Sequence, residues 1–321
     1  MYLGVLTVPY SAKSLDETMA ILSKQGVQSV ELGAGGYPGN AHCDPVAVAA
    51  DPAKAAEILA LAKKYNMKIS ALSVHGNPVH PDKAVAKKFH DEFAATCKAA
   101  QALGVDTVIT FSGCPGDTLD AKLPNWVTCS WPPDYLQVLD FQWNEVLIPY
   151  WKEAAALAES FGVKKIALEM HPGFCVYNPG TLLRLREAVG GIIGANFDPS
   201  HLYWQGINIP AAIKALKGAI HHFHAKDTKI DQRNTDVNGV LDSTPYGDIA
   251  GRSWVFRTIG YGHDAAEWKD IISTLRATGY EGAISIEHED GMMSIDEGLS
   301  KAIAFLRDVL IFEAPAEMWW A

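Results

Sequence analysis

The sequence lacks the cysteine pattern of a disulfide-stapled or zinc-knuckle protein. It has five cysteines, an odd number, and no two of them stand in a C-x-x-C spacing. Disulfide-dependent secreted domains usually carry an even set at short spacings, and structural zinc sites usually use C-x-x-C pairs. We therefore expect reduced thiols in a reducing compartment, at Cys43, Cys97, Cys114, Cys129 and Cys175.

Membrane-length hydrophobic runs are also absent. No apolar stretch approaches the roughly 20 residues that a membrane span needs, although 48% of the residues are apolar. The first residues, MYLGVLTVPYSAKSLDE, lack the basic segment and the small-residue cleavage site of a signal peptide. These absences favour a cytoplasmic protein with no membrane partner, whose first segment forms the first strand of the fold.

Positive charge is scarce. There are 27 Lys and Arg against 37 Asp and Glu, which gives a net charge of −10. A nucleic-acid surface needs a basic stripe to neutralise phosphates, and no cluster of Lys and Arg occurs in this sequence. The charge balance therefore weighs against a nucleic-acid partner, and we expect a small-molecule substrate.

Short β-rich runs alternate with amphipathic helical segments from end to end. The strand candidates are residues 3–8, 29–35, 69–76, 106–113, 164–172, 193–201, 220–227 and 282–290. Eight strand-then-helix repeats with near-continuous apolar strands predict an α/β fold, a closed parallel (β/α)8 TIM barrel. The rival, a doubly wound open sheet, often has a glycine-rich turn after its first strand, where this chain reads TVPYSAKS.

We expect residues 1–310 to form a single catalytic barrel domain and residues 311–321 to form a C-terminal tail. Two connections are too long for ordinary loops, residues 114–142 after the fourth strand and residues 228–263 after the seventh. Both follow the carboxyl ends of strands, which is the active face of such a barrel. They are predicted to be lids or substrate walls, with packing or interface insertions as the alternative.

The tail contains a Met-Trp-Trp sequence, Met318 to Trp320, after a proline. Exposed tryptophan pairs rarely remain in water, so we expect this segment to dock on its own barrel, on a copy of the chain or on another subunit. A homo-oligomer is the expected assembly, and a small second subunit is a further candidate partner.

Polar side chains gather where the predicted strands end. They are Glu169, His171, Asp198, His201, His222, His224, Lys226, Glu287, Glu289 and His75. In a parallel barrel these ends converge on one mouth, where several carboxylates without a cation are costly. Two Glu, one Asp and one or two His form a mixed oxygen and nitrogen ligand set that suits Mn²⁺, Co²⁺, Mg²⁺, Fe²⁺ or Zn²⁺. A hydrogen-bonded structural network is the alternative for any one of these residues.

Four segments resemble the xylose isomerase-like TIM barrels of the sugar phosphate isomerase/epimerase superfamily. They are LEMHP, the D-x-x-H of FDPSH, HFHAKD, and IGYGHDAAEWKDIISTLRATGYEGAISIEHED. The resemblance covers essentially the whole chain. It implies a metal bound by Glu169, Asp198, His224 and Glu287, with Mn²⁺ favoured, and a substrate contact from His201. It further implies that Glu169 and Glu287 act as the acid/base pair on opposite faces of the substrate.

The chain departs from two patterns of this superfamily. The fourth strand ends TFSG, without the histidine that a three-zinc nuclease of the same fold needs. The arginine that epimerases carry shortly after the seventh-strand histidine is replaced by Ile230. His75, His171 and Lys226 are therefore predicted only as substrate contacts or as residues that support the ligands. For Lys226, an ion pair with Asp227 is the alternative.

The resemblance implies a metal-dependent sugar isomerase or epimerase that acts on a keto-sugar or a related polyol ketone. Such chemistry removes a weakly acidic proton next to a carbonyl, which a cation and a carboxylate together make possible. The alternative is the catalytic subunit of a C-glycoside deglycosidase, which acts as a lyase on 3-oxo-glycosides through the same deprotonation. Trp126, Trp131 and Trp143, around the first long connection, fit an aromatic aglycone. A non-catalytic sugar-binding barrel is the third possibility.

Overall fold

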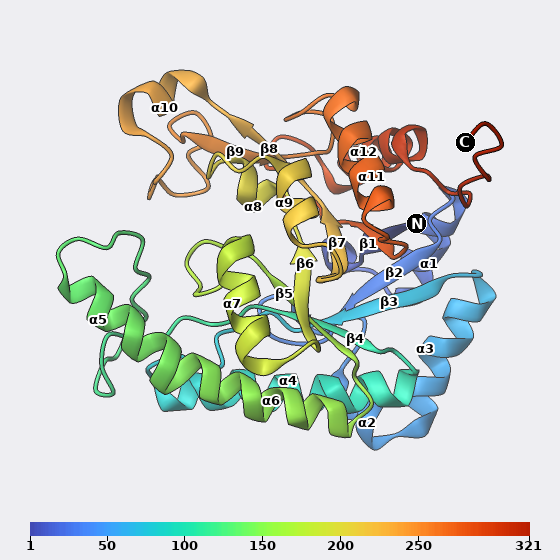
Figure 1. The fold of residues 1–321 in the computed structure, drawn as a ribbon. Coiled ribbons are helices and arrows are strands. Elements are labelled where there is room, and N and C mark those ends of the chain that lie inside the picture. Colours follow the sequence, from blue (N-terminus) through green and yellow to red (C-terminus); the bar gives the residue numbers. More distant parts are fainter.

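The predicted barrel is confirmed by a computed structural model that describes residues 1–321 (Figure 1). Eight parallel strands close in the order β1-β10-β7-β6-β5-β4-β3-β2. Their bounds are β1 Tyr2–Leu6, β2 Ser29–Gly33, β3 Lys68–Ser73, β4 Thr107–Thr110, β5 Lys165–Glu169, β6 Ile193–Phe197, β7 Ile220–Ala225 and β10 Ala283–Ile286. The chain begins and ends on the same side of the barrel.

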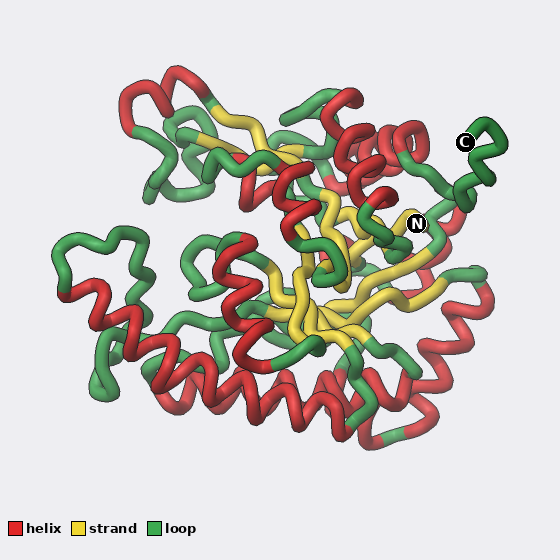
Figure 2. The backbone as a smooth tube through the Cα atoms, in the orientation of Figure 1, coloured by secondary structure: helices red, strands yellow, loops and turns green.

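Helices surround the strands (Figure 2). They are α1 Leu15–Lys24, α2 Pro45–Ala50, α3 Pro52–Lys64, α4 Lys83–Leu103, α6 Ile148–Ser160, α7 Pro179–Val189, α8 Ser200–Tyr203, α9 Ile209–Ala215, α11 Ala265–Ala277 and α12 Ile295–Val309. Their ends follow local rules. Ser14 and Glu17 form a capping box at the start of α1, and Gly104 closes α4 in a left-handed conformation with a φ of 66°.

The barrel strands alternate between two environments. In β7, Phe223 and Ala225 belong to the main apolar core, whereas His222 and His224 hydrogen-bond to other barrel strands. Successive side chains of a strand point to opposite faces, so one face of each strand packs on the helices and the other lines the barrel interior. The interior is consequently polar beside β7, which the near-continuous apolar pattern did not predict, whereas Ala71, Ile109 and Ala167 form a small apolar cluster on β3, β4 and β5.

The strands are shorter than the sequence predicted at their carboxyl ends. β10 ends at Ile286 rather than at residue 290, and β5 ends at Glu169 rather than at residue 172. The polar residues that follow have left the parallel ladder, so His171 does not share a strand face with Glu169. His201 likewise lies on the short helix α8 instead of on a strand.

The two long connections contain structure of their own. After β4, α5 (Asp134–Asp140) continues through a π-helical segment, Phe141–Leu147, directly into α6. After β7, β8 (Asp227–Ile230) pairs antiparallel with β9 (Trp254–Arg257), with α10 (Gln232–Asn238) between them. The β8–β9 hairpin was not predicted. It projects from the barrel together with α10 in Figure 1.

Asp227 anchors the base of this hairpin. The side chain is fully buried, and its two oxygens accept six hydrogen bonds, from four backbone N–H groups, the His263 ring and the Trp268 indole. Gly262 is required here, because a Cβ would lie 2.4 Å from a carboxylate oxygen of Asp227. The G-Y-G-H sequence is therefore a backbone cradle for one carboxylate.

The tail after α12 does not dock on its own barrel. Trp319 is 88% exposed and Trp320 is 68% exposed. The centroids of their two rings lie 5.7 Å apart, so the rings pack on each other. The expected alternative in which this segment docks on its own barrel is thus not adopted. No helix of the structure combines the length and the apolar character needed to cross a membrane.

Candidate metal centre

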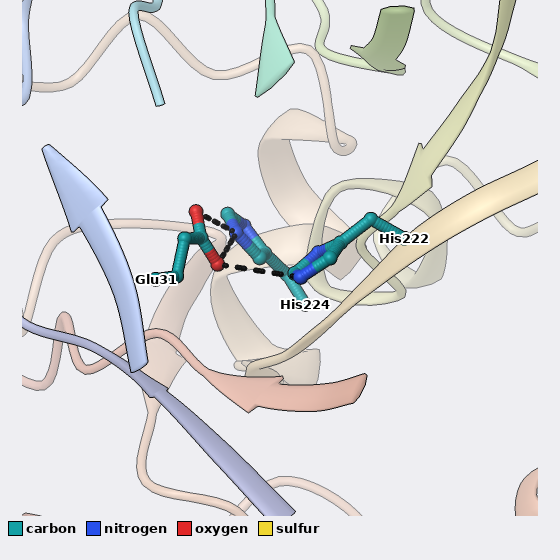
Figure 3. Close-up of side chains that lie close together, drawn as sticks. All are labelled: Glu31, His222 and His224. Atoms are coloured by element: carbon teal, nitrogen blue, oxygen red, sulfur yellow. Dashed lines mark hydrogen bonds and ion pairs between the residues drawn. The ribbon is translucent and has the colours of Figure 1, made fainter. Parts of the chain in front are cut away.

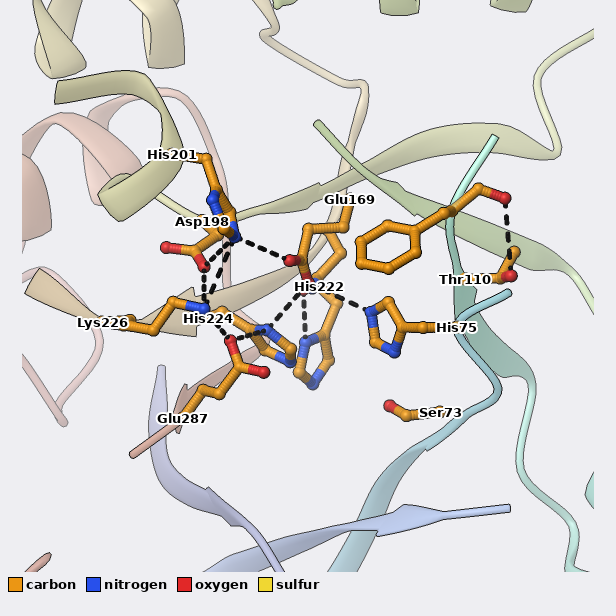
Figure 4. Close-up of polar contacts among 12 residues, drawn as sticks. Ser73, His75, Thr110, Glu169, Asp198, His201, His222, His224, Lys226 and Glu287 are labelled. Carbon is orange, nitrogen blue, oxygen red and sulfur yellow. Dashed lines mark hydrogen bonds and ion pairs between the residues drawn. The ribbon is translucent and has the colours of Figure 1, made fainter. Parts of the chain in front are cut away.

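The four predicted ligands meet at the carboxyl-terminal end of the barrel (Figure 4). Glu169 is the last residue of β5 and His224 lies in β7, whereas Asp198 and Glu287 directly follow β6 and β10. One ligand atom from each of the four lies within 4.8 Å of the other three. Residues that are far apart in the sequence thus form one cluster because the parallel strands end at the same rim.

Glu169 is held by histidines on both of its oxygens. Oε1 lies 3.1 Å from His201 Nε2, and Oε2 lies 3.1 Å from His75 Nε2. Asn196 donates to Oε2 at 2.9 Å. Burial raises the pKa of this carboxyl, but His75 and His201 outweigh burial and hold the pKa well below its usual value. Glu169 is therefore a fixed carboxylate at neutral pH.

Two atoms of the cluster are buried without a hydrogen-bond partner, Asp198 Oδ2 and His224 Nδ1. His224 Nδ1 lies 3.1 Å from an oxygen of Glu169 and 3.2 Å from one of Glu287, without the angles of a hydrogen bond. Asp198 Oδ2 lies 3.1 Å from the Lys226 ammonium and 3.2 Å from His201 Nε2, also without hydrogen-bond geometry. Buried polar atoms are normally hydrogen-bonded, so both atoms remain available to a further partner. A divalent cation that prefers oxygen and nitrogen ligands fits both atoms.

Lys226 supplies positive charge at the outer side of the cluster. Its ammonium lies 2.6 Å from Glu287, 3.0 Å from Glu289 and 3.1 Å from Asp198. The alternative of an ion pair with Asp227 is wrong, because the Asp227 carboxylate is occupied by the loop described above. Lys226 instead balances part of the charge of three carboxylates.

The pKa values in the cluster are spread widely. Burial raises the pKa of Asp198 to about 7, against the opposing effect of Lys226 and with the help of Glu169 and Glu287. Burial also raises the pKa of Glu287, but Lys226 and His224 reverse this and hold it below its ordinary value. Burial lowers the pKa of His224, yet Glu31 and Glu287 raise it well above 6.5. Strongly shifted groups of this kind gather at functional sites.

The remaining predicted residues surround this cluster. His201 lies 3.2 Å from Asp198 Oδ2, and burial together with the nearby His171 and Lys226 lowers its pKa well below 6.5. His75 contacts Glu169, as described above. His171 reaches none of the four ligands by a hydrogen bond, and its ring packs 4.0 Å from the ring of His201. His75 thus touches a ligand, and His171 lies one layer further out.

Three buried residues at the centre were missed as site residues. Glu31 of β2 bonds to His224 Nε2, and Asn196 of β6 joins Glu169 to His222, whose Nδ1 lies 3.0 Å from the Asn196 oxygen. A carboxylate in the apolar run SVELG was the available signal for Glu31. His222 was noted at a strand end, but its role in orienting Asn196 depends on a neighbouring strand.

A second group of potential ligands, Glu31, His222 and His224, lies beside the first. The carboxylate of Glu31 is already paired with His224 Nε2 and with the hydroxyls of Ser73 and Ser285. No oxygen or nitrogen of Glu31 or His222 is left orphaned. The hydrogen bonds thus separate the two groups, and the first is the better candidate for a cation site.

A cavity of about 490 Å³ opens beside the cluster. Its polar side includes His171 and Glu289, and its apolar side includes Tyr246, Phe256 and Met292. Phe256 of β9 joins the cavity to the cluster, with its ring 4.6 Å from the Lys226 ammonium. The connection after β7 therefore lines this cavity. Cavities of this size are typical of small-molecule sites.

The family model described as "Xylose isomerase-like TIM barrel" matches residues 19–309. The chain belongs to this family. The match spans most of the barrel, including the ends of all strands that carry the cluster. The xylose isomerase-like fold predicted from the sequence motifs is thereby confirmed.

Several proteins resemble this xylose isomerase-like chain. It is 38% identical to the uncharacterized protein YfiH of Bacillus subtilis over 312 residues, which cover 97% of the chain and 99% of the relative. It is 31% identical to an inosose isomerase of Halalkalibacterium halodurans over 138 residues, 42% of the chain and 43% of that protein. A crystal structure of D-psicose 3-epimerase in the presence of D-fructose superposes with a TM-score of 0.64 at 15% identity, covering 97% and 99% of the two chains. That last likeness shows a shared fold.

Proposed function

We propose that the chain is a divalent-metal-dependent isomerase or epimerase that acts on a keto-sugar or a related polyol ketone. The observation that carries the proposal is the cluster of Glu169, Asp198, His224 and Glu287, in which two buried ligand atoms make no hydrogen bond. These four residues would hold the cation. Once bound, the cation would supply Lewis-acid stabilisation of the negative charge that develops on the substrate oxygens.

Glu169 and Glu287 are the proposed proton carriers. Both are ionised at neutral pH, as their lowered pKa values indicate. Glu169 lies on the His75 and His201 side of the cluster, whereas Glu287 lies beside Lys226. Two carboxylates on different sides of a bound ring allow one to remove the proton next to the carbonyl and the other to return it. This arrangement is what an epimerase or an isomerase requires.

His201 and Lys226 are the proposed polar contacts to the substrate. His201 is neutral, so its imidazole can exchange a hydrogen bond with a hydroxyl without adding charge. Lys226 remains an ammonium, since Asp198 and Glu287 raise its pKa well above its usual value against the effect of burial. An ammonium near the reacting carbon favours an oxygen that gains negative charge.

Inososes are the first substrates to examine. The partial relative named inosose isomerase supports a cyclic polyol ketone, and the superposed D-psicose 3-epimerase, crystallised with D-fructose, supports an open ketose. Both classes present a carbonyl next to a carbon that carries hydroxyl and hydrogen. The proposed chemistry needs no more than that arrangement and a contact to the cation.

The direct test is exchange of the proton next to the carbonyl with deuterated water, followed by NMR across keto-sugars and inososes. We expect exchange with Mn²⁺ and none after chelation. Glu169→Gln and Glu287→Gln should each lower the exchange rate by about 10²- to 10⁴-fold, while Glu153→Gln on the exposed surface of α6 should not. Absence of exchange with every ketone tested, in the presence of Mn²⁺, would contradict the proposal.

A second candidate is a lyase that acts on 3-oxo-glycosides, including C-glycosides. The observation in its favour is the apolar wall of the cavity, where the rings of Tyr246 and Phe256 stack at 5.8 Å. Such a wall accepts an aromatic aglycone as readily as the C–H face of a sugar. The test is release of the aglycone from an oxidised C-glucoside. No release by the pure protein, with or without a small second subunit, would remove this candidate.

A non-catalytic sugar-binding barrel is separated from both enzymes by the same glutamine variants. If ligand binding survives in Glu169→Gln while turnover vanishes, the residue acts in catalysis. If the unmodified chain binds a keto-sugar and never turns it over, the non-catalytic sugar-binding barrel is the better description.

A further inference from the structure

We propose that Glu31 is a positioning residue, which holds His224 so that its Nδ1 lone pair faces the metal centre; this inference rests on the proposed function. The contact crosses the barrel, because β2 and β7 are not neighbours in the sheet. His224 Nε2 lies 2.9 Å from Oε1 and 3.0 Å from Oε2 of Glu31 (Figure 3). One ring nitrogen therefore faces both oxygens of a carboxylate.

This contact fixes which nitrogen carries the hydrogen. An ionised carboxylate only accepts hydrogen bonds, so the nitrogen that faces Glu31 must donate. In a neutral imidazole the other nitrogen, Nδ1, then carries the lone pair. Nδ1 is the orphaned atom that lies beside Glu169 and Glu287. The hydrogen bond on one side of the ring thus prepares a ligand on the other side, as carboxylates commonly do for metal-binding histidines.

Glu31 is itself fixed from two further strands. Ser285 of β10 donates to Oε2 at 2.7 Å, and Ser73 of β3 donates to Oε1. Glu31 has no exposed surface, so it cannot touch a substrate and must act through the residues it contacts. A buried carboxylate in an apolar strand costs free energy unless its oxygens are paired. The donors from three strands meet that requirement and fix the direction in which the carboxylate points.

The test is to measure the affinity for Mn²⁺ from the electron paramagnetic resonance signal of the free ion. This method can also determine weak dissociation constants. Glu31→Gln keeps the side-chain volume and removes the carboxylate that fixes the imidazole. We expect the dissociation constant to rise by about 10- to 100-fold. Ser70→Ala is the matched control, because Ser70 of β3 bonds to Val30 and His222 but touches neither Glu31 nor His224. It should change the affinity by less than about twofold.

A double-mutant cycle separates positioning from a general structural role. In a His224→Ala background there is no ring left to orient, so Glu31→Gln should have no further effect on Mn²⁺ affinity. The inference would be overturned if Glu31→Gln weakened Mn²⁺ binding by the same factor with His224 present and with His224→Ala. It would also be overturned if Glu31→Gln alone left the affinity unchanged. A purely structural role would lower the thermal midpoint of the metal-free variant and leave the affinity of the folded protein intact.

If the Glu31→Gln variant does not fold, a second pair of substitutions tests the same inference. Ser73→Ala/Ser285→Ala leaves the carboxylate in place and removes the two hydroxyls that hold it, so we expect an affinity loss of several-fold. No loss would count against the inference. If the unmodified chain binds no Mn²⁺, the proposed function fails and this inference with it. If it binds Mn²⁺ and the variants bind equally, only the inference fails.

Discussion

Asp198 and His224 both carry pKa values that are raised above their ordinary values, although one is an acid and the other a base. Asp198 titrates near pH 7 because it is buried beside Glu169 and Glu287. His224 holds its proton because the carboxylates of Glu31 and Glu287 face its ring, which outweighs its burial. The metal-free cluster therefore holds protons on atoms that a cation needs in their deprotonated form.

This arrangement predicts that metal binding releases protons. As pH rises through about 7, Asp198 loses its proton in the metal-free protein, and the competition between proton and cation weakens. The affinity for Mn²⁺ should therefore increase from pH 6 to pH 8. Titration calorimetry in two buffers with different ionisation enthalpies counts the released protons.

Asp198→Asn provides the comparison for this measurement. The amide has no proton to lose at that position, so the variant should bind Mn²⁺ more weakly and with a shallower dependence on pH. An affinity that stays constant between pH 6 and pH 8 in the unmodified chain, with no proton release, would show that these ligands are not the ones that hold the cation.

At the scale of the element, the buried carboxylate of Asp227 is one of the main ties between the β8–β9 hairpin and the barrel, beside the ion pair of Arg257 with Asp290. Asp227→Ala would leave three partly buried N–H groups of the 258–263 loop without acceptors. Unpaired buried donors cost about 1–3 kcal/mol each, so we expect the free energy of unfolding to fall by roughly 3 kcal/mol or more. Urea denaturation of the metal-free protein measures this loss.

Asp264→Ala is the matched control for Asp227→Ala. Asp264 lies in the same segment and caps α11 by accepting from the backbone N–H groups of Ala266 and Glu267, but it is exposed. Loss of such a cap typically costs about 1 kcal/mol. If the Asp227 variant proved no less stable than the Asp264 variant, the cradle would not be one of the main ties of the hairpin.

At the scale of the whole molecule, the exposed tail is the feature that a lone barrel does not explain. We propose that the chain forms a homo-oligomer in which the Met-Trp-Trp segment contacts a second copy. Deletion of residues 311–321 should reduce the mass found by light scattering to that of one shortened chain, which is below the 34.8 kDa of the full-length monomer. The thermal midpoint should change little, because every residue of this segment is exposed on its own barrel.

The result that would contradict this proposal is a full-length chain that already has the monomer mass. A mass above the monomer that survives the deletion would place the interface elsewhere on the surface. Either result leaves the metal centre unaffected, since the tail follows α12 and contributes no residue to the cluster.

The sequence by itself determined the barrel and the identity of the four clustered residues. Strand and helix periods are local, and eight repeats leave few folds open. The strand ends pointed to ten polar residues, and the resemblance to the xylose isomerase-like barrels singled out Glu169, Asp198, His224 and Glu287 among them. Parallel strands bring such ends together whatever the details of packing, so the cluster could be predicted before the structure.

The tertiary structure alone decided which partner each polar atom has. Glu31 and His224 are 193 residues apart and meet only across the closed barrel, so no local pattern could join them. The ends of the strands, the β8–β9 hairpin and the exposure of the tail likewise depend on contacts between distant segments. The two ligand atoms that make no hydrogen bond could be identified only with every donor and acceptor in place, because hydrogen bonding depends on positions in space.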